Sequence, residues 1–149
     1  MIKLINGRGQ VGCFLYEKID SLFSKEEVFI YHTWNIENKS EKSQKLEYKK
    51  FMDFVKENKN KRIIFISTTS QKESPYVKYK QMSESYLLQN NENSLVLRFP
   101  TLIGKGVFCG FKNDEKQPYG EMNIATIKQA CDFIIQNINY NGFSKTRSL

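Results

Sequence analysis

Tyr76 and Lys80, four residues apart, are the two side chains whose types and spacing point most clearly to joint chemistry. On a helix, this spacing places both side chains on one face. An ammonium group beside a phenol favours the phenolate, so we expect Lys80 to lower the pKa of Tyr76 from its reference of ~10 toward a value useful for proton transfer. Thr68 lies at the end of the preceding apolar run and could offer a hydroxyl to a substrate oxygen. A tyrosine and a lysine at this spacing are also common on lysine-rich helices without any chemical role, so their context decides.

The segment 7–12 is a second candidate, because its glycines have the spacing GxGxxG. It lies between a short apolar run at 2–5 and an apolar stripe of helical spacing at 11–23, as in a turn from a strand into a helix. Glycines at such a turn let a pyrophosphate approach the backbone, and free N–H groups of the helix N-terminus stabilise its charge. A glycine-rich turn that binds no ligand remains the alternative.

Two further side chains lie at the end of the run at 28–32 and just beyond it. His32 is the only histidine and could face a ligand from the end of a strand, but we favour a satisfied core histidine at this position. Trp34 could line a nucleotide or sugar pocket. It could equally cover a bare sheet edge, which would otherwise invite pairing with another chain.

The elements that must position these residues alternate between strands and helices along the chain. Apolar runs predict strands at 2–5, 28–32, 63–66 and 95–97, and periodic stripes predict helices at 40–58, 76–90 and 124–137. In the helix at 40–58 we expect four inward side chains, Leu46, Phe51, Phe54 and Val55. Residues 104–120 hold four glycines and a proline and read as irregular. Alternation of this kind predicts βαβ units and a parallel sheet. The sequence therefore predicts one α/β domain over 1–149, a three-layer Rossmann-like fold with about four parallel strands and helices on both faces.

Composition narrows the classes of function. The 149 residues carry a net charge of +7, much of it in a lysine-rich helix with interleaved acidic residues, which we interpret as a solvated face rather than a nucleic-acid site. No apolar run approaches the ~20 residues of a membrane helix. The glycine cluster follows the first five residues at once, so we expect no signal peptide. The three cysteines form no CxxC pair or zinc pattern. We therefore expect a cytoplasmic protein that binds neither a membrane nor a metal.

Several segments, in collinear order, resemble the extended short-chain dehydrogenase/reductases, the NAD-dependent epimerases, dehydratases and reductases of nucleotide sugars. Residues 62–70 and 74–84 look like the active-site region of that family, and 95–104 look like its next strand and loop. The turn at 9–12 is similar to that of the dTDP-4-dehydrorhamnose reductase group. The strand at 28–32 and the helix after Asn123 also resemble segments of the family.

The resemblance implies a role for each matching residue. Tyr76 would act as the general acid/base, Lys80 would hold the nicotinamide ribose and tune Tyr76, and Thr68 would bind the reacting oxygen. The residues that would receive the pyrophosphate of NAD or NADP are Gly7, Gly9, Gln10, Val11 and Gly12. The implied function is a minimal oxidoreductase or epimerase acting on a nucleotide-activated sugar in surface polysaccharide synthesis.

The chain is about half the length usual for that family. If the strand at 28–32 corresponds to the family's fourth strand, the second and third strands are missing. If it corresponds to the second strand, no carboxylate near 31–33 could bind the adenosine ribose. A non-catalytic Rossmann-like binding or partner module is therefore the alternative. An exposed sheet edge would allow such a module to form a homodimer or to bind a different partner chain.

Overall fold

The computed structural model describes residues 2–5, 27–103 and 124–149. Its main sheet has five parallel strands in the order β1-β2-β3-β4-β7. Their bounds are Ile2–Ile5 for β1, Val28–Tyr31 for β2, Arg62–Thr68 for β3, Ser94–Phe99 for β4 and Thr146–Ser148 for β7. The predicted α/β fold with a parallel sheet is confirmed. β7 is a fifth strand beyond the four that the sequence predicts.

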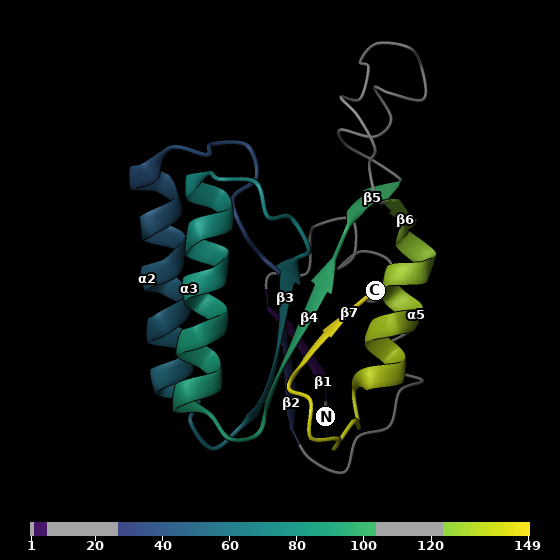
Figure 1. The fold of residues 1–149 in the computed structure, drawn as a ribbon. Coiled ribbons are helices and arrows are strands. Elements are labelled where there is room, and N and C mark those ends of the chain that lie inside the picture. Colours follow the sequence, from purple (N-terminus) through teal and green to yellow (C-terminus); the bar gives the residue numbers. More distant parts are fainter. Residues whose placement is uncertain (1, 6–26, 104–123) are drawn as a thin grey trace.

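In the described part of the chain, three helices cover the two faces of this sheet (Figure 1). α2 (Glu41–Glu57) and α3 (Pro75–Asn90) lie side by side on one face, and α5 (Ile127–Asn137) lies on the other. The predicted bounds of α2 and α3 are confirmed because their caps can be read in the sequence. Ser40 accepts a hydrogen bond from the backbone of Ser43, and Ser74 caps α3, which begins with a proline.

The helix predicted from residue 124 begins three residues later. Residues Ile124–Thr126 form β6, which pairs in parallel with β5 (Thr101–Ile103) in a separate small sheet. Thr126 then caps α5 through a reciprocal capping box with Gln129. None of the described helices is long and apolar enough to cross a membrane.

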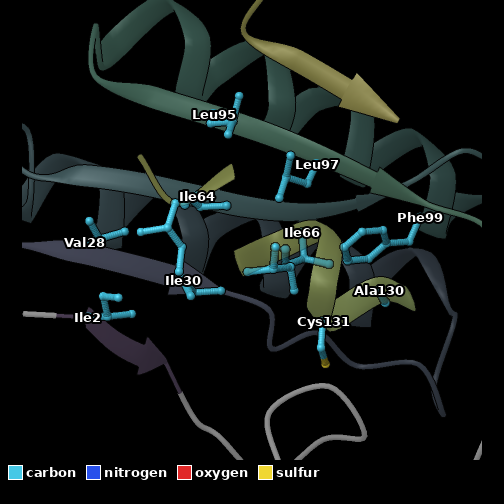
Figure 2. Packing of buried hydrophobic residues seen from close by; sticks show 12 residues of the cluster. Ile2, Val28, Ile30, Ile64, Ile66, Leu95, Leu97, Phe99, Ala130 and Cys131 are labelled. Atoms are coloured by element: carbon cyan, nitrogen blue, oxygen red, sulfur yellow. The ribbon is translucent and has the colours of Figure 1, made fainter. Parts of the chain in front are cut away.

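The core is divided by the sheet into two clusters. Successive strand residues point to opposite faces, and both faces are covered, which explains the continuous apolar run in β3. On the α5 side, aliphatic residues of β1 to β4 pack against Ala130, Cys131 and Ile134 of the helix (Figure 2). On the α2/α3 side the packing is mostly aromatic, and its buried members include Tyr31, Phe51 and Phe65.

The inward face of α2 differs from the expectation at two positions. Phe51 and Val55 are fully buried, as predicted, and Phe54 packs partly against the same cluster. Leu46 is 53% exposed, so its predicted inward position is wrong, and fully buried Gln44 takes a place on the stripe instead. Residue 44 lies seven and eleven positions before Phe51 and Val55, close to two and three helical turns, whereas residue 46 is out of phase.

The described strands of the main sheet all lie to one side of β1. Each strand after β1 is added on the same side, so the strand order does not reverse within the described part of the chain. In doubly wound sheets the dinucleotide lies at such a reversal. The glycine turn at 7–12, the stripe at 11–23 and the irregular segment at 104–120 lie outside the described residues.

Candidate functional site

The candidate site lies at the carboxyl ends of β2 and β3, where ligands of parallel sheets usually bind. The β2–β3 ladder stops at the pair Tyr31–Phe65, whereas β3 continues beside β4 for three more residues, to Thr68. Ile66 therefore lies beyond the end of β2. The segment 32–40, which connects β2 to α2, begins at the same place.

Lys80 reaches from α3 to the part of β3 that extends beyond the end of β2. Its Nζ atom donates a 2.8 Å hydrogen bond to the carbonyl oxygen of Ile66, and the residue is only 4% exposed. The same nitrogen lies 4.6 Å from the ring centroid of Trp34 and 4.9 Å from that of Phe65. Lys80 thus satisfies a strand carbonyl while remaining almost enclosed by aromatic rings.

This enclosure changes the acid–base properties of the amine. Burial lowers the pKa of Lys80 from 10.5 to about 7, because desolvation penalises the ammonium, and the carboxylates of Glu84 and Glu47 offset only part of that penalty. Near neutral pH both the ammonium and the free amine of Lys80 are populated. A lysine of this kind can give up or accept a proton where an exposed lysine cannot.

Tyr76 lies one helical turn before Lys80 on α3. The Lys80 Nζ atom is 5.9 Å from the Tyr76 ring centroid, so the structure brings the two predicted residues together. Burial raises the pKa of Tyr76, because desolvation disfavours the phenolate. The expectation that Lys80 lowers this pKa is therefore wrong here. Tyr76 is a protonated phenol at neutral pH and is suited to donate a proton.

Thr68 and His32 lie at the same edge of the sheet. Thr68 Oγ1 accepts a 3.1 Å hydrogen bond from the backbone N–H of Ser70, which leaves its hydroxyl proton available to another acceptor. His32 Nε2 is buried without a hydrogen-bond partner, so the favoured interpretation of a satisfied core histidine is wrong at that atom. Burial and the charge of Lys80 both lower the pKa of His32.

Trp34 lies inside the site. It contacts Phe65 of β3 and Lys80 of α3, and its Nε1 atom donates a 2.6 Å hydrogen bond to Gln44. These contacts are with central elements of the sheet face rather than with β1. They favour the prediction that Trp34 lines a pocket over the prediction that it covers a bare edge.

Two residues of the site were not predicted from the sequence. Lys39 places its Nζ atom 5.1 Å from the Tyr76 ring centroid, and it comes from the segment before α2 rather than from α3. Gln44 holds the segment that carries Trp34 and Lys39. Gln44 could have been found from its helical phase with the buried residues of α2. Nothing in the sequence distinguishes Lys39 from the many lysines that follow it, so its place in the site could not be predicted.

A buried polar network lies beside the site between α3 and the sheet. Glu84, one turn after Lys80, accepts two hydrogen bonds from Arg98 of β4, at 3.0 and 2.6 Å, and one from the hydroxyl of Ser67 at 2.5 Å. Because Glu84 is nearly fully buried, this pairing offsets the cost of removing its charge from water. The network fixes the face of α3 that carries Lys80.

Two surface hollows lie elsewhere. One of about 440 Å³ lies between α2 and α3 and is lined by Tyr48, Met82 and Tyr86 among others, and one of about 560 Å³ lies on the first half of α2. Neither includes Tyr76, Lys80 or Thr68. In the described part of the chain, no cluster of three or more His, Cys, Asp or Glu side chains could hold a metal ion.

No protein-family model and no curated protein sequence matches the chain. Several solved structures nevertheless share its architecture. A dTDP-4-dehydrorhamnose reductase from Clostridium acetobutylicum superposes with a TM-score of 0.70 at 16% identity, over 99% of this chain and 73% of that one. A dTDP-glucose 4,6-dehydratase from Bacillus anthracis, in complex with NAD, gives 0.63 at 11% identity over 99% and 74%. The Bordetella bronchiseptica enzyme WbmG, in complex with NAD, gives 0.63 at 10% identity over 95% and 55%. WbmG has also been crystallised with both NAD and UDP. The chain therefore has the Rossmann-like fold of these enzymes, and the resemblance expected from its sequence is confirmed at the level of the fold.

Proposed function

We propose that the chain is a minimal NAD(P)-dependent oxidoreductase or epimerase that acts on a nucleotide-activated sugar. One observation carries the proposal: Tyr76 and Lys80 lie within one helical turn of each other at the carboxyl ends of β2 and β3. The fold supports it, since the similar structures include two enzymes named for dTDP-sugar substrates and three complexes with NAD. On this proposal, residues 1–149 form a single shortened Rossmann-like domain.

The donor set of the site suits the nicotinamide end of such a cofactor. A phenol, an amine that titrates near neutral pH, a hydroxyl and an imidazole nitrogen without a partner lie at one edge of the sheet. A bound nicotinamide cofactor would supply the hydride chemistry, and the protein would supply binding, orientation and proton transfer. The residues proposed for the pyrophosphate, Gly7 to Gly12, lie outside the described residues.

The site residues divide the remaining work. Tyr76, held protonated by its burial, donates its phenolic proton to the oxygen of the sugar carbonyl whose carbon is being reduced, and takes a proton back from the hydroxyl in the reverse direction. Thr68 donates a hydrogen bond to the same oxygen, keeps its own proton, and so helps to orient the carbonyl. Lys80 holds the ribose hydroxyls and keeps a positive charge, or a ready donor, beside Tyr76.

A calorimetric titration with NAD(H) and NADP(H) tests the proposal first. We expect binding of at least one form. The absence of binding by every form at millimolar concentration would exclude the dehydrogenase interpretation. If a cofactor binds, Tyr76→Phe should abolish turnover across a panel of nucleotide-activated sugars while leaving cofactor affinity nearly unchanged. Tyr86→Phe, the same substitution on the outer part of α3, is the matched control and should retain turnover.

One observation favours a second candidate. Every described strand of the main sheet lies to one side of β1, so the half-sheet that would bind the adenosine is not found in the described part of the chain. The second candidate is a non-catalytic binding or partner module that pairs through its sheet edge with another chain. Failure of cofactor binding, together with a stable dimer in sedimentation analysis, would favour this module over the enzyme.

A further inference from the structure

Gln44 is a fully buried amide in the first turns of α2. Its Nε2 atom donates hydrogen bonds of 2.8 Å to the backbone carbonyls of Asn35 and Asn38, and its Oε1 atom accepts the 2.6 Å bond from Trp34. A buried amide that makes three such bonds has nearly exhausted its capacity. Gln44 therefore ties three points of the segment 34–38 to one helical position.

Residues 35–43 also form hydrogen bonds among themselves. Asn35 Oδ1 accepts from the backbone N–H groups of Glu37 and Asn38, and its Nδ2 atom donates to Ser43 Oγ. Asn38 Oδ1 accepts from the backbone of Ser40, the cap of α2. With these bonds in place, residues 34–40 have one defined path from β2 into α2.

That path carries two side chains into the candidate site. Trp34 lies against the Nζ atom of Lys80, and Lys39 lies against the ring of Tyr76. The side-chain bonds of Gln44 go to the segment 34–38 and not to Lys80 or Tyr76, so it acts on those two residues only through the segment that it holds.

We propose that Gln44 is a positioning residue of the candidate site, whose amide holds Trp34 against Lys80 and Lys39 beside Tyr76. Its role in turnover rests on the proposed function, but its role in holding Trp34 does not. The titratable groups that face Lys80 are His32 after β2, Glu47 on α2, and Tyr76 and Glu84 on α3. From β3, Lys80 meets the carbonyl oxygen of Ile66 and the ring of Phe65, neither of which is titratable. Gln44 adds no charge to this set, so its effect on Lys80 is purely one of enclosure.

Trp34 is the only tryptophan of the chain, so its fluorescence reports this site alone. An ammonium and a free amine 4.6 Å from the indole ring perturb it differently, so the emission should follow the protonation of Lys80 with a midpoint near pH 7. Lys80→Met should abolish that transition. In Gln44→Met we expect red-shifted emission and a midpoint raised by about one pH unit or more, because water reaches the amine.

Gln89→Met, the same substitution at an exposed position on α3, is the matched control and should leave both the emission and the midpoint unchanged. The proposal would be overturned if the Trp34 emission of the wild type did not change with pH near neutrality. It would also be overturned if wild type and folded Gln44→Met had the same midpoint. Circular dichroism establishes that each variant is folded.

A second measurement needs no variant at Gln44. Nitrogen-15 labelling gives a single indole N–H signal, from Trp34, and its hydrogen bond to Gln44 should protect it from exchange with solvent by about tenfold or more. Exchange at the rate of a free indole would overturn the proposal. Both measurements use the protein without cofactor. The protein could bind no NAD(P) and still show slow exchange of the Trp34 indole N–H and an emission that follows pH. That result would refute the proposed function and leave the role of Gln44 intact.

Discussion

Replacing Lys80 with methionine should change how the stability of the protein depends on pH. In the folded state the pKa of Lys80 is lowered from 10.5 to about 7 by burial. Between these two values the unfolded chain binds more protons than the folded one, so the free energy of unfolding rises with pH. Below pH 7 the full cost of burying the ammonium is present, and above about pH 10 it is gone. Methionine has a similar shape and no charge, so it removes this dependence.

The size of the effect follows from the two pKa values of Lys80. A pKa that differs by one between the folded and unfolded chains corresponds to about 1.4 kcal/mol, so the burial of Lys80 opposes folding by about 4–5 kcal/mol below neutral pH. Between about pH 7 and pH 9 the wild type should therefore gain about 2 kcal/mol of stability that Lys80→Met does not gain. Ionisation of Tyr31 and Tyr76 does not contribute between about pH 7 and pH 9, because burial raises the pKa values of both tyrosines.

Urea denaturation followed by circular dichroism at the two pH values measures the effect. The quantity compared is the difference between wild type and Lys80→Met, in which contributions from unrelated groups cancel. Lys49→Met, which removes an exposed lysine from α2, is the matched control and should follow the wild type. Parallel pH dependence of wild type and Lys80→Met would refute the buried, readily deprotonated amine on which the site depends.

Three further substitutions test the packing around the site by urea denaturation. Arg98→Met leaves buried Glu84 without its cation and should cost about 2–3 kcal/mol, at or below the ~3–5 kcal/mol of a fully buried pair because Arg98 is partly exposed; a loss below about 0.5 kcal/mol would contradict the network. Ser40→Ala removes the cap of α2 and should cost about 1 kcal/mol, and an unchanged stability would show that the cap is not formed. Leu97→Ala in the fully buried core should cost about 2–5 kcal/mol, whereas Leu88→Ala at an exposed position should cost far less; equal losses would contradict the assigned core.

The parts of the fold that the sequence predicts are those with strong local signals. β3 is a continuous apolar run, and α2 is bounded by Ser40 and Asn58, so both could be placed closely. β7 could not be predicted, because its three residues are polar and form a strand only through pairing with β4. β6 was included in a helix because apolar periodicity continues through it, and only its pairing with β5 separates the two elements.

The sequence predicts that Tyr76 and Lys80 lie together, but it does not predict their acid–base properties. The four-residue spacing of Tyr76 and Lys80 correctly placed them together. Spacing carries no information on burial, and burial decides that Tyr76 is held protonated and that Lys80 is the group that titrates near neutral pH. The role of Gln44 was missed because a glutamine on an apolar stripe reads as an interruption, although in the structure it is the anchor of the neighbouring segment.

The central claim is that a nicotinamide cofactor binds beside Trp34, Tyr76 and Lys80. Energy transfer from Trp34 to NADH tests it most directly, because the chain has a single tryptophan and that residue lies in the proposed site. Titration with NADH or with NADPH should quench Trp34 and produce sensitised nicotinamide emission that saturates, and an excess of the matching oxidised form should reverse both signals. Unchanged Trp34 emission with both NADH and NADPH at millimolar concentration, after correction for absorbance, would contradict the account.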